Sequence, residues 1–283
     1  GAARAAREEM ETMTTTTDRY AEFRQLHQSG CFVMPNPWDP GSARLLVQLG
    51  FPAVATTSTG FAWSRAVRDH QVSLEEMLRH LRDLAAAVPV PVNADFEGGF
   101  ATSPDDVAKN VAAAATTGIA GLSIEDSTGD HSAPLYDFEL AVDRIRAARA
   151  AIDRTAPGVL LTGRSEGFIA GRPDLAETIR RLTAYAAAGA DCLFAPGIRG
   201  REQVAAIVTG VAPKPVNVLV GGDWTTVAEL AELGVRRISV GGALARTGWT
   251  AVIAAAAEVA EHGTFGSFAG TVSSSDLEGR IAR

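Results

Sequence analysis

The chain has 283 residues, a length that suits one large α/β domain, and its 26 basic and 33 acidic side chains give a net charge of −7. Hydrophobic residues make up 46% of the sequence and charged residues 21%, as in ordinary globular proteins. Because no segment is rich in lysine and arginine and no apolar run is long enough to span a bilayer, we expect neither nucleic acid nor a membrane among its partners.

The first 17 residues are small, charged and threonine-rich, without a sustained apolar face. We expect residues 1–17 to be a disordered or added leader, and residues 18–283 to form a single domain with a C-terminal helical tail. Cys31 and Cys192 each lie in an apolar run, which is typical of buried thiols in a reducing compartment. The sequence therefore predicts a cytoplasmic protein.

Short apolar segments bounded by Gly, Pro, Asn or Asp recur along the chain and predict eight strands. These segments are Cys31–Asn36, Ala53–Ser58, Val90–Asp95, Gly121–Glu125, Val159–Ser165, Asp191–Ala195, Val216–Val220 and Arg237–Val240. Most of them are hydrophobic throughout, as expected of strands that are buried on both faces.

Helical patterns fill the gaps between these strands, and a further helix, Asp18–Gln28, precedes the first one. The eight helices predicted after strands are Asp39–Leu49, Ser73–Ala87, Ser103–Thr117, Asp137–Arg154, Asp174–Ala188, Arg201–Thr209, Thr225–Leu233 and Ala243–His262. Eight strands that are each followed by a helix specify an α/β fold of the (β/α)₈ TIM barrel type. The alternative, an open doubly wound sheet, usually has a glycine-rich first turn, and Pro35–Asp39 has no such pattern.

Polar side chains follow the third and fourth predicted strands, where a barrel places its active site. Asn93, Asp95 and Glu97 alternate along the chain, so they can point to one side, and Glu125 ends the next strand. Carboxylate and amide oxygens suit a hard cation such as Mg²⁺, with Mn²⁺ as a substitute. The alternative is that such acids cap the following helices, which Asp126 could do. The predicted metal site consists of Asn93, Asp95, Glu97 and Glu125.

Arg164 and Glu166 follow the fifth strand two positions apart, and therefore lie on one face. Arginine binds carboxylates with two parallel hydrogen bonds, so Arg164 is a candidate to hold a substrate carboxylate, with Glu166 beside it. An ion pair of Arg164 with Glu166 or Glu125 is a compatible alternative. The polar loop Ser127–Tyr136, which contains His131, is either a lid or a plain surface connection.

After the second strand, Thr59, Gly60 and Phe61 form a turn whose backbone N–H groups could approach an anion closely. Asp69 and His70 follow this turn and could supply acid–base chemistry, although such a pair is more often part of a solvated loop.

At these positions the sequence resembles the isocitrate lyase/phosphoenolpyruvate mutase superfamily, from Phe23 to His262. The segments that carry the resemblance are Ser58–Gly60 with Val67–Asp69, Asn93–Asp95 with Gly98–Gly99, Ile124–Asp126, and Gly163–Glu166. The resemblance implies a barrel that assembles as a homotetramer with its last helix exchanged between subunits. It implies Mg²⁺ near Asp95 and Glu125, bound mostly through water and chelated by a 2-oxo acid. The groups implied to hold the substrate carboxylate are the backbone of Thr59, Gly60 and Phe61 and the side chain of Arg164. Asp69 matches the family's active-site aspartate.

Two departures from the family pattern bear on the reaction. The family usually has Asp-x-Asp after the third strand, and here the first position is Asn93, for which Glu97 could compensate. The carbon–carbon lyases of the family carry a lid cysteine that acts in acid–base catalysis, and the phosphonate enzymes carry a lid lysine. Ser127–Tyr136 contains no Cys, Lys or Arg.

The leading hypothesis is a Mg²⁺-dependent lyase or decarboxylase that acts on a small 2-oxo or 2-hydroxy carboxylate through an enolate, with His131 or Asp69 handling protons. One alternative is a mutase or hydrolase of the phosphonopyruvate/phosphoenolpyruvate type, similar to carboxyvinyl-carboxyphosphonate phosphorylmutase, which the lack of a lid cation disfavours. Another is a degenerate barrel without catalytic activity.

Other barrel chemistries find less support in the sequence. A Schiff-base aldolase needs a lysine at a strand end, but the two lysines, Lys109 and Lys214, lie within a helix and before a strand. Gly221-Gly222 and Gly241-Gly242 end the seventh and eighth strands, where many barrels bind phosphate, but no further motif supports a phosphosugar isomerase.

Overall fold

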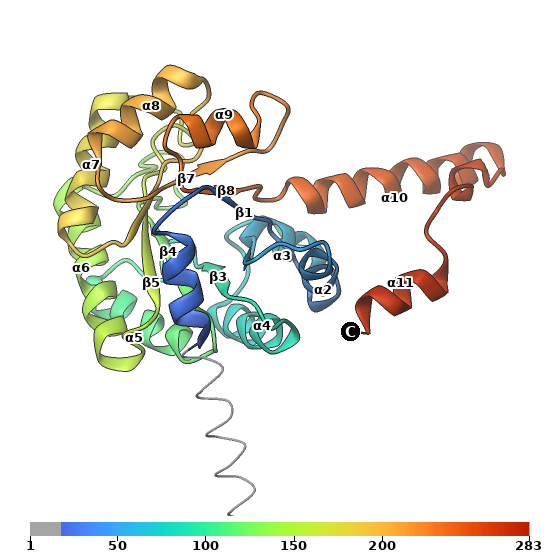
Figure 1. The fold of residues 1–283 in the computed structure, drawn as a ribbon, viewed down its shortest axis with the longest axis horizontal. Coiled ribbons are helices and arrows are strands. Elements are labelled where there is room, and N and C mark those ends of the chain that lie inside the picture. Colours follow the sequence, from blue (N-terminus) through green and yellow to red (C-terminus); the bar gives the residue numbers. More distant parts are fainter. Residues whose placement is uncertain (1–17, 283) are drawn as a thin grey trace, which may run out of the picture.

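The computed structural model describes residues 18–282, so the predicted leader over residues 1–17 lies outside the described residues. Eight parallel strands form one sheet in the order β1-β8-β7-β6-β5-β4-β3-β2 (Figure 1). The strands are β1 (Phe32–Met34), β2 (Val54–Ala55), β3 (Val92–Asp95), β4 (Gly121–Glu125), β5 (Leu160–Arg164), β6 (Cys192–Phe194), β7 (Val216–Leu219) and β8 (Arg237–Ser239). The first and last strands of this order also meet, because the N–H of Ala55 donates to the carbonyl of Pro35 at 3.0 Å. The predicted barrel is confirmed.

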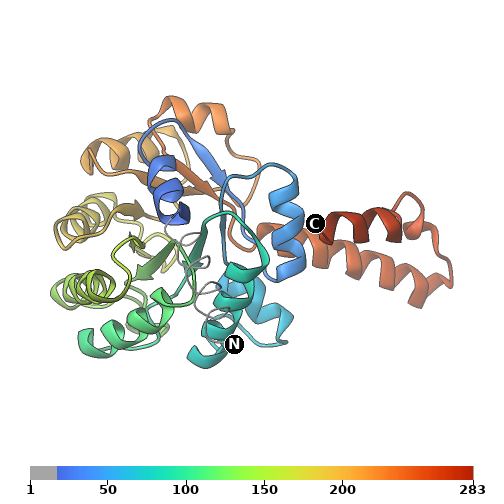
Figure 2. The ribbon, with the colours of Figure 1, turned by 60° about the horizontal axis from the view of Figure 1, so that its bottom comes forward.

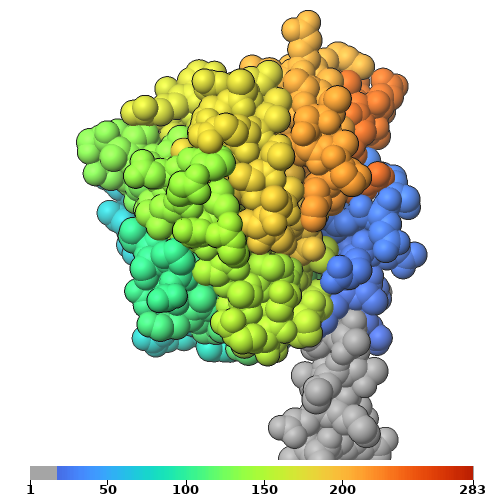
Figure 3. Space-filling model, turned by 90° about the vertical axis from the view of Figure 1, so that its left-hand side faces the viewer, coloured from blue at the N-terminus to red at the C-terminus, as the bar shows by residue number. Residues whose placement is uncertain are grey.

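Helices surround the sheet, and the helices from α5 to α8 form a continuous outer face (Figure 3). The helices that follow strands are α2 (Pro40–Gln48), α3 (Ser58–Ser64), α4 (Leu74–Ala87), α5 (Pro104–Ala115), α6 (Phe138–Thr155), α7 (Leu175–Ala187), α8 (Arg201–Gly210), α9 (Val227–Glu232) and α10 (Ala243–His262). Residues 18–26 are also helical, as predicted, and bury Phe23 against Phe32 and Leu160 at the amino ends of the strands. Within the described residues, none of the helices combines the length and the apolar character that crossing a membrane requires.

Helix α3 corrects one prediction. Ala53–Ser58 is predicted as a strand, but β2 ends at Ala55 and the chain turns into α3 at Ser58. The physical reason is Thr57, whose side chain accepts a hydrogen bond from the N–H of Gly60 at 3.1 Å and so caps the helix. The turn that carries the Ser58-Thr59-Gly60 motif is therefore the first turn of a helix.

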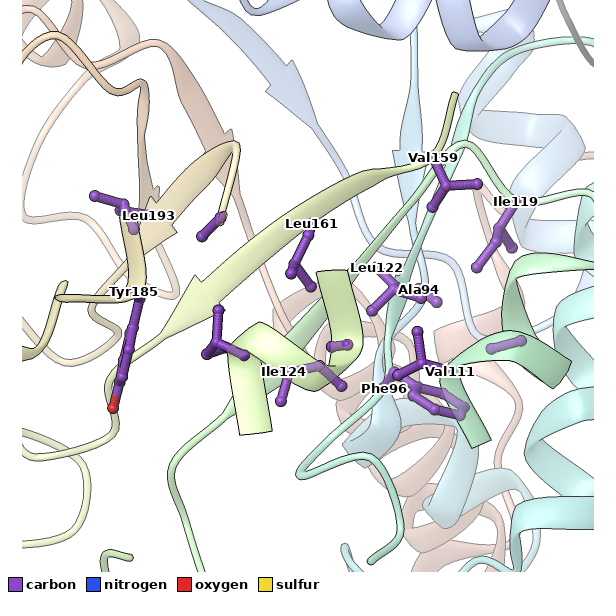
Figure 4. Close-up of a cluster of buried hydrophobic side chains, with 14 of the residues drawn as sticks. Ala94, Phe96, Val111, Ile119, Leu122, Ile124, Val159, Leu161, Tyr185 and Leu193 are labelled. Carbon is purple, nitrogen blue, oxygen red and sulfur yellow. The ribbon is translucent and has the colours of Figure 1, made fainter. Parts of the chain in front are cut away.

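Side chains of β3, β4 and β5 alternate between the barrel axis and the helices. Ala94, Leu122, Ile124 and Leu161 point outward into the core between the sheet and the helices (Figure 4). Each buried leucine or isoleucine of this kind contributes about 1.5–3 kcal/mol. Their sequence neighbours point inward, and the parallel register places Asp95 beside Ser123, and Glu125 beside Arg164. The alternation thus puts the polar residues of three strands on one side of the sheet.

Gly163 lets α7 approach β5 closely. A Cβ atom at this position would lie 2.8 Å from the Cβ of Tyr185, which is shorter than real carbon–carbon contacts. The glycine of the Gly163-Arg164 motif is therefore needed for packing, while the arginine beside it faces the barrel axis.

Helix α10 leaves the barrel and extends away from it (Figure 2). Ala245 is its one buried residue, while Val252 and Ile253 are 58% and 66% exposed. The chain then turns through η1 (Gly266–Phe268) and returns as α11 (Ser274–Ile281), where the carbonyl of Ile281 accepts from Arg44 Nη1 of α2 at 3.0 Å. Trp249, Val252 and Ile253 of α10 are therefore exposed within residues 18–282.

Candidate active site

A cavity of about 270 Å³ opens at the carboxyl ends of the strands. Seven of the predicted site residues line it: Thr59, Asp69, Asn93, Asp95, Glu125, Arg164 and Glu166. They come from separate stretches of sequence, and they meet because the carboxyl ends of all eight parallel strands lie at the same mouth of a barrel.

Arg164, the last residue of β5, holds carboxylates from three strand ends. Its Nη1 atom lies 3.0 Å from Asp95 Oδ1 and 3.2 Å from Glu125 Oε2, and its Nε atom donates to Glu166 Oε1. Its Nη2 atom has no hydrogen-bond partner within residues 18–282. One guanidinium therefore brings the three acids together and still has donors for a further carboxylate.

Burial alters the charge of this cluster. Burial raises the pKa of Glu125 well above its ordinary value, and Arg164 opposes that rise only in part. Burial likewise raises the pKa of Glu166, again against the effect of Arg164. Burial disfavours the charged form of Arg164, but Glu166, Glu125 and Asp95 together outweigh it and hold the pKa of Arg164 above its usual range. The arginine is always charged, and the acids around it outnumber the positive charge.

Asp95 is fixed by the segment that follows β2. Its Oδ2 atom accepts from the N–H of Ser58 at 2.9 Å, and its own N–H donates to Thr56 Oγ1 at 2.8 Å. The start of α3 therefore orients Asp95, which explains why the Ser58-Thr59-Gly60 motif matters to an acid on another strand.

The three backbone groups predicted to bind a carboxylate are not equally available. The N–H groups of Gly60 and Phe61 donate to the side chain and the carbonyl of Thr57, at 3.1 Å and 3.0 Å. The ring of Phe61 stacks on His80 with 3.7 Å between ring centroids, outside the cavity lining. The N–H of Thr59 has no acceptor within the described residues, and its hydroxyl donates to Asp69 Oδ2. Thr59 and Asp69 therefore form one polar unit of the cavity wall.

Glu97 lies beside the main cavity and not in it. Strand β3 ends at Asp95, and the φ angle of Glu97 is +47°, so the strand alternation that aligns Asn93 with Asp95 does not reach Glu97. The expectation that all three residues share one side is wrong for Glu97. His70 Nδ1 lies 2.9 Å from Glu97 Oε2, and His70 lines both the main cavity and the hollow that contains Glu97.

The His70–Glu97 pair holds a proton. The hydrogen bond to Glu97 is the main cause that raises the pKa of His70 to about 9, against the effect of burial. Burial raises the pKa of Glu97, and His70 opposes that rise. Glu97 Oε1 is buried without a hydrogen-bond partner in the described part of the chain.

Arg144 of α6 positions the loop that carries Glu97, and sequence reasoning missed it. This side chain is fully buried, and its guanidinium donates to the carbonyls of Gly98, Ala101 and Thr102, the last at 2.8 Å. An arginine on the inner face of a helix is unusual enough to have been a signal.

Asp126 holds the β4 and β5 ends to α7. Its Oδ1 atom accepts from the N–H of Glu166 at 2.7 Å, and its Oδ2 atom accepts from Tyr185 at 2.6 Å and from Arg181 at 3.1 Å. The alternative that Asp126 caps the next helix is therefore wrong, because its hydrogen bonds go to a strand end and to α7.

The floor of the cavity is a buried cation. Arg237, at the start of β8, donates to Asn217 at 2.9 Å and to Thr162 at 3.0 Å, and has no carboxylate partner within residues 18–282. Its third contact is His27, whose pKa burial lowers to about 3, so the imidazole is neutral and Nε2 accepts from Arg237. Asn93 lines the same region, and its Oδ1 atom is buried without a partner in the described residues.

The loop Ser127–Tyr136 folds on itself. The N–H of Thr128 donates to the carbonyl of Pro134 at 3.0 Å, and Ser127 pairs with Leu135 as an antiparallel bridge. His131 is exposed at the tip and does not line the main cavity. Its assignment as an acid–base group stays a prediction and requires the loop to move inward.

The chemistry of these residues fits a hard divalent cation. Within the part of the chain that the structure describes, no three His, Cys, Asp or Glu side chains are arranged to enclose a metal ion directly. The cavity does gather the side-chain oxygens of Asn93, Asp95, Glu125 and Glu166, and the buried Oδ1 atom of Asn93 has no partner in the described residues. Mg²⁺ keeps several waters and needs one or two protein carboxylates, so Asp95 and Glu125 are the residues that would hold it.

The isocitrate lyase/phosphoenolpyruvate mutase resemblance implies a barrel with Asp95, Glu125 and Arg164 in one site, and these three residues line one cavity. A family model described as phosphoenolpyruvate phosphomutase matches residues 23–260. The chain belongs to this family, and the predicted superfamily is confirmed.

Similar proteins include lyases, mutases and hydrolases. A protein of Burkholderia cenocepacia J2315, assigned as a lyase/mutase, is 44% identical with a TM-score of 0.92, over 95% of this chain and 98% of that one. An oxaloacetate decarboxylase of Bradyrhizobium diazoefficiens is 32% identical over 66% of this chain and 69% of its own. Oxaloacetate acetylhydrolase in complex with its product oxalate is 26% identical with a TM-score of 0.85, over 94% of both chains. Phosphonopyruvate hydrolase in complex with oxalate and Mg²⁺ is 25% identical with a TM-score of 0.84, over 93% of this chain and 95% of that one. The chain is an enzyme of this lyase/mutase class.

The His70–Glu97 pair predicts a pH dependence of the metal-free protein. The pKa of His70, about 9, lies above the value of about 6.5 for an unfolded histidine. The pair therefore stabilises the fold fully below pH 6.5, and this contribution is lost as the pH rises through 9. Urea unfolding of the wild type and of His70→Gln should differ at about pH 6.5 and converge above pH 9. An NMR titration that places the His70 midpoint near 6.5 would contradict the pairing.

Proposed function

We propose that this protein is a Mg²⁺-dependent lyase or decarboxylase that acts on a small 2-oxo or 2-hydroxy carboxylate through an enolate, with oxaloacetate as the first candidate. The observation that carries the proposal is the arrangement of Arg164. It organises three carboxylates at the barrel mouth, and its Nη2 atom remains without a partner in the described residues.

Arg164 and Thr59 would bind the carboxylate of the substrate. Both line the cavity, and both have N–H groups without an acceptor within residues 18–282. A carboxylate that accepts from Nη2 of Arg164 and from the N–H of Thr59 receives charge-assisted hydrogen bonds in a partly buried site, where such bonds are strong. Asp95 and Glu166 keep the guanidinium in place, so little ordering is needed when the substrate binds.

The metal would be held by Asp95 and Glu125, with Asn93 as a further oxygen donor in the same cavity, whereas Glu97 faces His70 in the neighbouring hollow. Mg²⁺ supplies positive charge that stabilises the negative charge developing on the 2-oxo group as the neighbouring bond breaks. Because burial raises the pKa of Glu125, a cation beside it would favour its ionised form.

Thr59 and Asp69 would handle the proton. When oxaloacetate loses CO₂, the bond between C3 and C4 breaks, the electron pair stays on C3 as the enolate of pyruvate, and a proton must then reach C3. The Thr59 hydroxyl donates to Asp69 in the cavity wall, so this pair can hold a proton next to the reacting carbon. His131 would take part only if the loop that carries it moved inward.

The charge of the site favours carbon–carbon over carbon–phosphorus chemistry. A phosphonate brings close to two negative charges in addition to the substrate carboxylate. The cations that line the main cavity are Arg164, His70 and Arg237, of which Arg164 is bonded to three acids, His70 to Glu97, and Arg237 is buried below. An unpaired buried charge is costly, so a departing carboxylate, which leaves as neutral CO₂, suits this site better.

A direct comparison of substrates tests the reaction. With Mg²⁺ present, oxaloacetate should be turned over faster than phosphonopyruvate. The variant Arg164→Lys should lower kcat/KM for oxaloacetate by about 100-fold, because a single ammonium cannot replace the fork of donors. Faster turnover of phosphonopyruvate than of every 2-oxo dicarboxylate would reverse the assignment. Metal binding without turnover of any 2-oxo acid would favour the non-catalytic barrel.

A titration of metal affinity tests the proposed ligands. Asp95→Asn and Glu125→Gln each remove one negative charge and should weaken Mg²⁺ or Mn²⁺ binding by about tenfold or more in calorimetry. Glu22→Gln makes the same kind of change on the exposed helix at the opposite end of the barrel, and serves as the matched control. Equal affinity in all three variants and the wild type would exclude Asp95 and Glu125 as ligands.

We further propose that the chain forms a homotetramer in which α10 is exchanged between neighbouring subunits. The uncovered side chains of Trp249, Val252 and Ile253 on a helix that leaves its own barrel support this assembly. Light scattering should give four times the chain mass of 29.5 kDa, and Ile253→Glu should lower that mass. A particle of 29.5 kDa at micromolar concentration would contradict the assembly.

A further inference from the structure

A second hollow adjoins the main cavity on the side of β7 and β8. This hollow, the β7–β8 groove, has a volume of about 520 Å³ and is lined by residues after β6, β7 and β8 and by the first turn of α10. It shares Thr59, Leu219, Gly241 and Gly242 with the lining of the main cavity. The two hollows are therefore neighbours at the barrel mouth.

Glycines keep the groove open. A Cβ atom at Gly221 or Gly222 would have no heavy atom within 4 Å, so a side chain at either position would occupy empty space. Neither glycine has a positive φ angle, so the backbone does not require glycine there. The small residues instead leave room for a ligand, with their backbone N–H groups without acceptors in the described residues.

Two arginines line this groove, and neither has a carboxylate partner within residues 18–282. Arg246 donates from Nη2 to the carbonyl of Gly221 at 3.0 Å, which holds the side chain across the groove and leaves Nε and Nη1 available. The guanidinium of Arg199 makes no hydrogen bond to a described residue. Asp223 also lines the groove, so the three side chains give it a net positive charge. This sign is opposite to that of the acid cluster around Arg164.

The remaining wall is apolar. Trp63, Trp224 and Leu219 line the groove, Leu219 also lines the main cavity, and both tryptophans are half-buried. A ligand that passes from the main cavity to Arg199 and Arg246 would therefore place a carbon chain against these side chains.

We propose that the β7–β8 groove binds an oxyanion, a phosphate or a carboxylate, at the far end of the substrate's substituent, between Arg199 and Arg246. The proposal rests on the proposed function for the reacting end of the substrate. The 2-oxo or 2-hydroxy carboxylate lies at Arg164, the carbon chain crosses Trp63 and Leu219, and the distal anion receives hydrogen bonds from the two guanidinium groups. The substrate class is then a 2-oxo or 2-hydroxy acid whose substituent ends in an anion.

Anion binding can be measured without turnover. Inorganic phosphate would be titrated into the wild-type protein in a calorimeter, and glutarate would be titrated in a separate experiment. Each titration would be done once with oxalate and Mg²⁺ added to fill the main cavity, and once without them. We expect one site per chain, and a loss of affinity of about tenfold or more in Arg199→Gln and in Arg246→Gln, because each removes a charged donor. Gly222→Leu fills the groove without removing a charge and should weaken binding to a similar extent. Arg154→Gln, the same exchange at the exposed end of α6, is the matched control.

The outcomes distinguish a failure of the proposed anion site from a failure of the proposed reaction. Tighter binding of phosphate assigns a phosphorylated substituent, and tighter binding of glutarate assigns a carboxylate. Affinity that is unchanged in the three groove variants, or that falls as much in Arg154→Gln, overturns the proposal, as does the absence of binding at millimolar concentration. If the anion binds through Arg199 and Arg246 but no 2-oxo acid is turned over, the groove stands and the proposed reaction fails.

Discussion

The site depends on one guanidinium. Three carboxylates from β3, β4 and β5 meet at the barrel mouth, where burial alone would drive them toward their neutral forms and their charges would repel one another. Arg164 lies within hydrogen-bond distance of all three and stays charged, so it holds the acids together at a depth that water reaches only in part. Such a cluster contributes little to stability, because desolvation offsets most of the Coulomb attraction. The cluster instead fixes positions: it holds the carboxylate oxygens and the Nη2 atom of Arg164 around the same cavity.

A second set of charges, which does not face the cavity, holds the loops in place. Asp126 ties a strand end to Arg181 and Tyr185 of α7, and Arg144 clamps the carbonyls of the loop that carries Glu97. These residues act on the site through backbone that they position. Asp126 belongs to this second set and its neighbour Glu125 to the first, because successive residues at a strand end face the helices and the barrel axis in turn.

The barrel mouth is electrostatically divided. Around Arg164 the acids dominate and suit a divalent cation with a 2-oxo acid, whereas the adjoining groove at β7 and β8 is apolar along its wall and basic where Arg199 and Arg246 line it. A substrate with unlike ends would have one orientation in which each end meets a complementary charge. Binding energy from the distal end can then be used to place the reacting bond.

The sequence by itself determined the barrel, because eight hydrophobic runs that are each followed by an amphipathic helix, without a glycine-rich first turn, favour a closed sheet over an open one. Helix α10 also begins and ends at the predicted residues. The sequence also determined that Asp95, Glu125 and Arg164 share one mouth, since all three end parallel strands. It did not determine the place of Glu97, because the chain leaves the strand after Asp95 and a positive φ angle turns this residue toward His70. Only the tertiary structure decided such pairings, because they join residues that are far apart in the sequence. The spacing of apolar residues predicts which face of a strand or helix a side chain is on, but not which partner it contacts after that strand or helix has ended.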